Sequence, residues 1–320
     1  MRMPFGKLFH FSPQQPQTAP ETRTPQPEVQ VAQEEEPYEI MTIEVENTNG
    51  TTQPTMSSND TRVYLNYDID NPPPHPGSEW TRFVCLSDTH SDIYPVPNGD
   101  VLLHSGDLSS WGYLPQLQKT MNWLKTLPHP VKIIIAGNHD LCLDDAWRVG
   151  GTWDHSTGGA MSNKACLMLD TASTRAAGIH YLEYESFQFT APSGRTWDVY
   201  GTPACPRYAI GSFQYVGGFG NKEGEAIFAK IPRSTEILLT HTPPYGINDV
   251  SKRGKHAGCS SLASRLQSED LSNCRLHVFG HIHEAYGATI APSEGLRKER
   301  VSVNAAVRHG ELPAIVDLLN

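Results

Sequence analysis

Five short polar motifs carry side chains that can bind metal ions, and each comes directly after an apolar run. Carboxylate, imidazole and amide groups are the oxygen and nitrogen ligands that divalent transition metals accept in proteins. The motifs are Asp88-Thr89-His90, Gly106-Asp107, Gly137-Asn138-His139-Asp140, Thr240-His241 and Gly280-His281-Ile282-His283. One such motif is a common surface turn, but five in succession predict a shared metal site.

The apolar runs before these motifs have the length and composition of buried strands. They span residues 83–86, 101–103, 132–136, 237–239 and 276–279. In an α/β fold the carboxyl ends of neighbouring strands meet at one edge of the sheet, where ligands bind. We therefore expect the five motifs to converge there.

The segments between the strands indicate how the sheets are built. Residues 113–127 carry apolar side chains three or four positions apart, which predicts an amphipathic helix ended by Pro128. Further strands are expected at residues 179–190 and 197–200, as a hairpin or meander, and at 300–305 and 313–318. Parallel and meander features together predict an α/β fold, a two-sheet β-sandwich flanked by helices, with the metal ligands along one rim.

The first 77 residues differ in composition from the rest. They hold 12 of the 25 prolines and 11 Asp/Glu against 4 Lys/Arg, so seven of the ten net negative charges lie there. Such a segment buries too little apolar surface to offset the entropy of ordering. We expect residues 1–77 to be disordered or loosely packed, with strand-like stretches at 38–45 and 62–67 against the edge of the core. Residues 78–320 would form one folded domain.

Composition also excludes several classes of partner. Residues 78–320 are nearly neutral and contain no basic stripe, so a long nucleic acid is not an expected substrate. No apolar run reaches the roughly 20 residues of a membrane helix, and the first residues lack the apolar part of a secretory signal. The six cysteines are scattered, without paired spacing. These features favour a cytoplasmic protein.

The motifs and their flanks resemble the calcineurin-like metallophosphoesterase superfamily, most closely its metallophosphoesterase-domain-containing (MPPED-type) branch. The resemblance covers residues 82–319. It is carried by residues 81–91, 99–107, 135–139 and 276–284, and it ends near residues 303–305. It implies metal-dependent hydrolysis of phosphoester bonds by two divalent ions (Mn, Fe or Zn).

The resemblance also assigns metal ligands position by position. It gives Asp88, His90 and His283 to the first metal, Asn138, His241 and His281 to the second, and Asp107 to both. Two cations at about 3.5–4 Å repel each other, so a carboxylate between them is chemically reasonable.

The same pattern implies a mechanism. A metal-bridging hydroxide would attack phosphorus, because metal binding lowers the pKa of water to roughly 7. His139 matches the family's non-ligand histidine and is the expected general acid for the leaving oxygen. Asp140 follows it and is expected to orient that imidazole.

The resemblance also bears on the substrate. The resemblance implies a phosphodiesterase for cyclic nucleotides or other small phosphodiesters, and Tyr245, Arg253 and His256 are candidate substrate contacts. A solvated loop is the other interpretation of these three residues. A serine/threonine protein phosphatase and a non-catalytic protein-binding scaffold of the same fold are the alternative functions. His104 is expected to pack in the core, and His277 to lie at a strand edge.

Overall fold

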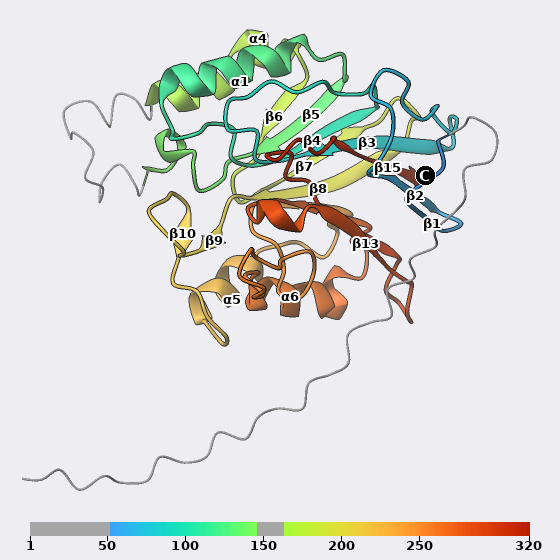
Figure 1. Ribbon diagram of the computed structural model, residues 1–320. Helices are drawn as coiled ribbons and strands as arrows, with labels where there is room; N and C mark the ends of the chain where they lie inside the picture. The colour runs from blue at the N-terminus through green and yellow to red at the C-terminus, as the bar shows by residue number, and fades with distance from the viewer. Residues whose placement is uncertain (1–51, 146–162) are drawn as a thin grey trace, which may run out of the picture. The chain divides into compact units, whose positions relative to one another are not determined.

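The computed structural model describes residues 52–145 and 163–320. Two β-sheets pack face to face, and helices cover the outer face of each sheet (Figure 1). This arrangement confirms the predicted α/β fold of two packed sheets flanked by helices.

The first sheet has seven strands in the order β1-β2-β15-β3-β4-β5-β6. Their bounds are β1 Met56–Ser57, β2 Thr61–Tyr64, β3 Trp80–Leu86, β4 Val101–Ser105, β5 Val131–Ile135, β6 Ile179–Tyr181 and β15 Ala314–Leu319. Strands β3 to β6 are parallel, and β15 runs antiparallel to β3. The carboxyl ends of β3, β4 and β5, which precede three of the motifs, therefore lie at the same edge.

The second sheet has six strands in the order β13-β14-β12-β11-β8-β7. Their bounds are β7 Glu185–Thr190, β8 Thr196–Thr202, β11 Ile237–Thr240, β12 Leu276–Phe279, β13 Gly287–Ala291 and β14 Arg300–Asn304. The expected hairpin is correct for β7 and β8. It is wrong for β6, because the chain turns at Tyr184, which has a φ of 56°, and β6 pairs with β5 of the first sheet.

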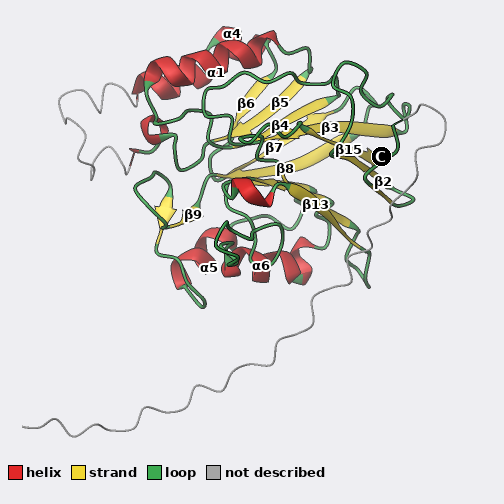
Figure 2. Ribbon diagram, in the orientation of Figure 1, coloured by secondary structure: helices red, strands yellow, loops and turns green. Residues whose placement is uncertain are grey.

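Helices lie on the two outer faces (Figure 2). Their bounds are α1 Leu114–Thr126 and α4 Ala172–Ala176 over the first sheet, α5 Lys222–Phe228 and α6 Ser260–Gln267 over the second, with residues 163–169 also helical. Helix α1 confirms the amphipathic helix expected at 113–127. Within the described ranges, no helix is both long enough and apolar enough to cross a membrane.

Alternating side chains of the central strands pack on opposite faces. In β3, Phe83 and Cys85 join the core between the sheets, whereas Val84 and Leu86 pack under α1. Since both faces are covered, the strand is buried along its whole length. This double burial explains why such strands are continuous apolar runs.

The segment just before residue 78 contributes strands to the first sheet. Strand β2 pairs with β15, and Val63 opposite Val316 is fully buried. Within residues 1–77, the strand expected at 62–67 against the core is found as β2, at residues 61–64. Residues 1–51, which include the strand-like stretch expected at 38–45 and on which the expectation of disorder mainly rests, lie outside the described residues.

A buried ion pair joins strands β3 and β15 and also binds the chain at residues 73–74. The Arg82 guanidinium on β3 donates to both carboxylate oxygens of Asp317 on β15, at 2.7 and 2.8 Å. It also donates to the main-chain oxygens of Pro73 and Pro74, at 2.6 and 2.9 Å. Both charged side chains are almost completely buried, so each depends on the other for compensation.

We predict that Asp317→Asn destabilises the protein by about 3 kcal/mol, because it leaves the Arg82 charge buried without its partner. Urea unfolding measures the effect. Asp170→Asn is the matched control, because Asp170 pairs with Arg175 on the exposed surface, where ion pairs contribute roughly 0–1 kcal/mol. Equal, small effects of the two substitutions would contradict the prediction.

Candidate metal centre

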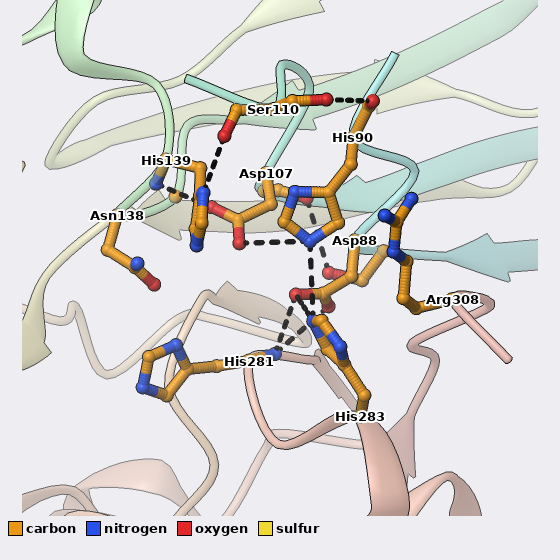
Figure 3. A network of polar contacts seen from close by, with 12 residues as sticks. Asp88, His90, Asp107, Ser110, Asn138, His139, His281, His283 and Arg308 are labelled. Atoms are coloured by element: carbon orange, nitrogen blue, oxygen red, sulfur yellow. Dashed lines mark hydrogen bonds and ion pairs between the residues drawn. The ribbon is translucent and has the colours of Figure 1, made fainter. Parts of the chain in front are cut away.

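The five motifs converge at the edge where the carboxyl ends of both sheets meet. The first sheet supplies three motifs, and the second sheet supplies Thr240-His241 and Gly280-His281-Ile282-His283. Figure 3 shows the side chains of Asp88, His90 and Asp107 from the first sheet close to that of His283 from the second. Asp88, His90, Asp107 and His283 each offer a ligand atom, and these four atoms lie within 4.8 Å of one another.

These four residues form a first donor cluster. The His283 Nε2 lies 3.1 Å from Asp88 Oδ1 and 3.3 Å from His90 Nε2. The His90 Nε2 lies 3.6 Å from Asp107 Oδ2. Mixed nitrogen and oxygen donors at such spacing suit a transition-metal ion.

A second donor cluster surrounds His241. The His241 Nδ1 lies 3.0 Å from the Ser105 main-chain oxygen and donates its proton there. Burial lowers the pKa of His241, so the imidazole is neutral and its Nε2 carries a lone pair. That atom faces Asn138 Oδ1 at 2.9 Å and Asp107 Oδ1 at 3.4 Å. Three acceptor atoms that face each other are electrostatically matched to a cation.

Asp107 links the two clusters, because its two carboxylate oxygens face different histidines. The carboxyl group is fully buried, and burial together with the neighbouring Asp88 charge raises its pKa well above the usual range. A cation on either side would favour the ionised form. The donor set therefore fits two metal ions with Asp107 between them.

Burial keeps the imidazoles of His90 and His281 unprotonated, because it lowers the pKa of each to about 3. His283 differs, because burial opposes its charged form but the hydrogen bond and the charge of Asp88 raise its pKa. Burial opposes the charged form of Asp88 as well, but the hydrogen bond from His283 holds its pKa well below the usual range. Unprotonated His90 and His281 beside an ionised Asp88 are in the states that metal binding requires, whereas His283 would give up its proton to a metal.

The backbone at this edge is strained. Asp88, His90, Asp107 and His281 have φ values of 58°, 47°, 54° and 68°, in the left-handed region that side chains other than glycine rarely occupy. A Cβ at Gly280 would overlap the Asp88 carboxylate, so only glycine fits there. Strain of this kind persists where the surrounding structure holds a functional geometry.

His139 and Asp140 do not act on each other as expected. The His139 Nδ1 donates to the main-chain oxygen of Ser110 at 2.6 Å, and its main-chain N donates to Asp107 Oδ1 at 2.8 Å. The buried Asp140 carboxylate instead accepts the main-chain N–H groups of Gly137, Leu108 and Ser109. The interpretation of Asp140 as the partner of the His139 imidazole is therefore wrong. Asp140 shapes the loops that carry Asp107 and Asn138.

Two fully buried histidines form hydrogen bonds with threonines in the loops that carry the candidate ligands. The His104 Nε2 lies 3.0 Å from Thr89 Oγ1, and the His277 Nε2 lies 2.8 Å from Thr240 Oγ1. The prediction that His104 packs in the core is confirmed. The strand-edge prediction for His277 is wrong, because β12 lies between β11 and β14. Each of these threonines is adjacent to a candidate ligand.

The predicted substrate-contact loop lies beside the centre. The Asn304 amide donates to the main-chain oxygens of Asn248, at 3.0 Å, and Ile282, at 2.9 Å, which ties the loop to the last motif. The structure brings Tyr245 and His256 together, with ring centroids 5.2 Å apart. The remaining candidate of the three, at position 253, is exposed in the same loop.

His256 is oriented by a buried carboxylate. Its Nδ1 lies 2.6 Å from Asp249 Oδ1, and the same carboxylate accepts the main-chain N–H groups of Gly246 and Gly258. The Nε2 atom of His256 is therefore the one left for other contacts.

Two residues at the centre, Ser110 and Arg308, were not predicted from the sequence. Ser110 and Arg308 both lie beside the histidines in Figure 3. Neither belongs to a motif, and each reaches the site through a loop, so no strand-end signal precedes it. Arg308 is held 2.9 Å from Asp92.

Comparison with known sequences agrees with this geometry. The family described as calcineurin-like phosphoesterase matches residues 81–285, a range that includes all five motifs. The human and mouse proteins named "Metallophosphoesterase domain-containing protein 1" are each 34% identical over 253 residues, covering 72% of this chain and 74% of theirs.

Two further proteins are similar over a smaller share of their length or at lower identity. A "Probable rhamnogalacturonate lyase C" from Emericella nidulans is 36% identical over 209 residues, which is 65% of this chain but 18% of that protein. A solved structure described as a dimetal phosphatase from Danio rerio gives a TM-score of 0.38 at 12% identity, covering 70% of this chain and 87% of that one. That likeness is too weak to bear on fold or activity.

We predict opposite effects of Asp107→Asn in metal-free and Mn²⁺-loaded protein. Without metal the substitution raises the urea midpoint of unfolding. The raised pKa of Asp107 means that its charge is disfavoured in the folded protein, and a neutral amide removes this cost. With Mn²⁺ at about 100 times Kd the native chain gains about 2.7 kcal/mol, and the variant gains much less.

Urea unfolding with and without Mn²⁺ measures both effects, and Asp198→Asn on β8 is the control that should behave as the native chain in each condition. Equal stabilisation of Asp107→Asn and the native chain by Mn²⁺ would contradict the role of Asp107 between the metals.

Proposed function

Because this chain belongs to the calcineurin-like phosphoesterase family, in its metallophosphoesterase-domain-containing branch, we propose that it is a phosphodiesterase for cyclic nucleotides or other small phosphodiesters. Metal-dependent hydrolysis of phosphoester bonds with two divalent ions is the activity of the family, and this chain is such a hydrolase. The observation that supports the proposal most is the Asp107 carboxylate, whose two oxygens face two separate donor clusters.

We assign one metal to each donor cluster. Asp88, His90 and His283 would hold the first, Asn138, His241 and His281 the second, and Asp107 would bind both. When bound, the two ions supply Lewis acidity that neutralises phosphate oxygens and lowers the pKa of water to roughly 7. Two carboxylates among these seven residues leave the loaded site net positive, which favours an anionic ester.

His139 is the proposed general acid for the leaving oxygen. Its Nδ1 is fixed by the Ser110 main-chain oxygen, so Nε2 is the nitrogen available to a substrate. The side chain is only partly buried, and its ring lies 4.7 Å from that of His90. A proton delivered from Nε2 would offset the charge that develops on the leaving oxygen.

A diester carries one negative charge and a monoester dianion two, so a monoester gains more from a cationic side chain that can reach the phosphate. Arg308, whose charge opposes protonation of His90 and His283, is already paired with Asp92. Its attraction for a second phosphate charge is therefore reduced, which is consistent with a diester. Tyr245, Arg253 and His256 are the proposed contacts for the remainder of the substrate.

The alternative functions differ in what they require. A non-catalytic scaffold has no need of a complete donor set, and every ligand of both clusters is present here. A serine/threonine protein phosphatase would prefer a phosphopeptide monoester.

The proposal is tested by titrating metal-stripped protein with Mn²⁺ and following hydrolysis of bis(p-nitrophenyl) phosphate, p-nitrophenyl phosphate and a phosphoserine peptide. Metal-dependent cleavage of the diester, faster than that of either monoester, is the expected result. Preference for the phosphopeptide would favour a protein phosphatase, and no turnover with two metals bound would favour the scaffold.

We predict that His139→Ala leaves the metal content unchanged and slows hydrolysis by about 10²- to 10⁴-fold for diesters with poor leaving groups. Esters with activated leaving groups, which need little protonation, should be slowed much less. Rates for a series of aryl leaving groups measure this, and His75→Ala, far along the chain at an exposed site bonded to Asp100, is the control. Equal slowing across the series would exclude His139 as the acid.

A further inference from the structure

Two large aromatic side chains next to the metal centre are exposed to solvent. Trp111 is 55% exposed and Tyr208 is 82% exposed. The Trp111 ring lies 5.1 Å from that of His139, and the Tyr208 ring lies 6.5 Å from that of His281. Exposed aromatic groups at a concave or functional surface commonly mark a contact for a ligand.

The two aromatic side chains lie near different donor clusters. His139, beside Trp111, has its ring 4.7 Å from that of His90 in the first cluster. His281, beside Tyr208, has its ring 5.0 Å from that of His241 in the second cluster. A phosphate held between the clusters would therefore have one aromatic side chain toward each of them.

Trp111 is held in its exposed position by its neighbours. Its main-chain N donates to Gln116 Oε1 at 2.9 Å, and the next residue, Gly112, donates to Ser109 Oγ at 3.1 Å. Gly112 packs so closely on Leu141 that a Cβ there would overlap it. The loop therefore presents Trp111 at a fixed place beside His139.

Tyr208 lies in the connection between two short paired strands, β9 (Cys205–Pro206) and β10 (Gln214–Tyr215). This connection is fastened to the metal-binding loop, because the main-chain N of Ser212 donates to the Asn138 main-chain oxygen at 2.9 Å. The Ser212 hydroxyl donates to the Gly137 main-chain oxygen at 3.1 Å. The position of Tyr208 is thus coupled to the backbone of a proposed ligand.

We propose that Trp111 and Tyr208 each contact one of the two substituents of a phosphodiester. This inference rests on the proposed function, in which His139 protonates the leaving oxygen. Trp111, beside His139, contacts the leaving group, and Tyr208 contacts the substituent that stays on phosphorus. The substrate class is a linear diester that carries a flat aromatic or heteroaromatic ring on each side.

This arrangement distinguishes linear from cyclic diesters. In a cyclic nucleotide both ester oxygens belong to one sugar, so a single base can reach only one of the two aromatic side chains. A linear diester carries a separate group on each oxygen and can contact both. Stacking of a ring on an aromatic side chain contributes enough that its removal lowers binding about tenfold or more.

Two diesters with the same leaving group test the inference in the metal-loaded full chain. Bis(p-nitrophenyl) phosphate has an aromatic retained group, and methyl p-nitrophenyl phosphate has a small one. We expect Trp111→Ala to lower kcat/KM about tenfold for both esters, because both release p-nitrophenol. We expect Tyr208→Ala to lower kcat/KM about tenfold for the bis-aryl ester and less than about twofold for the methyl ester.

The controls separate recognition from folding. Leu296→Ala, which truncates an exposed apolar side chain on the turn after β13, should leave both rates unchanged. Trp111→Phe and Tyr208→Phe keep an aromatic ring and should retain the parent's ratio between the two esters. Metal content is measured for every variant, because a collapsed loop at Asn138 would lower it.

Equal losses on both esters for Tyr208→Ala, or no loss for either alanine variant, would overturn the inference while the parent's diester cleavage still supports the proposed function. If the parent chain with two bound metals cleaves neither ester, the proposed function fails, and the inference fails with it.

Discussion

The site depends on one buried carboxylate that serves both sheets. Asp107 follows strand β4 of the first sheet, and its oxygens face His90 of the same sheet and His241 of the second. The His139 main-chain N–H donates to one of these oxygens, but burial still disfavours the charge that would make the carboxylate a strong ligand. An arrangement of this kind is unfavourable alone and becomes favourable around cations. The remainder of the fold has to hold these groups together before any metal arrives.

That task falls to the strands and their close contacts. The core between the sheets contains apolar side chains from both, so the two rims cannot move apart without exposing it. At the rim the Ser105 hydroxyl donates to the Val278 main-chain oxygen at 2.9 Å, and the Ser105 main-chain oxygen accepts from His241. His104 and His277 then fix the loops on the outer face of each sheet. The left-handed backbone at four candidate ligands is sustained by this support.

Features that depend on local sequence could be predicted, whereas features that depend on how distant segments meet could not. The strands and the motifs after them depend on local composition and strand length, and they were predicted correctly. The partners of His139 and Asp140 depend on how loops from three strand ends meet, and neighbouring positions in the sequence gave a misleading pairing. The burial of His277 could not be foreseen either, because it depends on which strands flank β12 in the sheet.

The proposed metal ligands and the proposed substrate contacts lie on different parts of the fold. The proposed metal ligands follow strand ends that are packed on both faces, so their geometry is set by the core and is insensitive to the substrate. The aromatic side chains and the loop with Tyr245 and His256 lie on connections between strands. Loops accept changes of sequence that strand ends cannot. If the proposed metals bind the phosphate that every substrate has in common, these loops are where we expect substrate preference to be set.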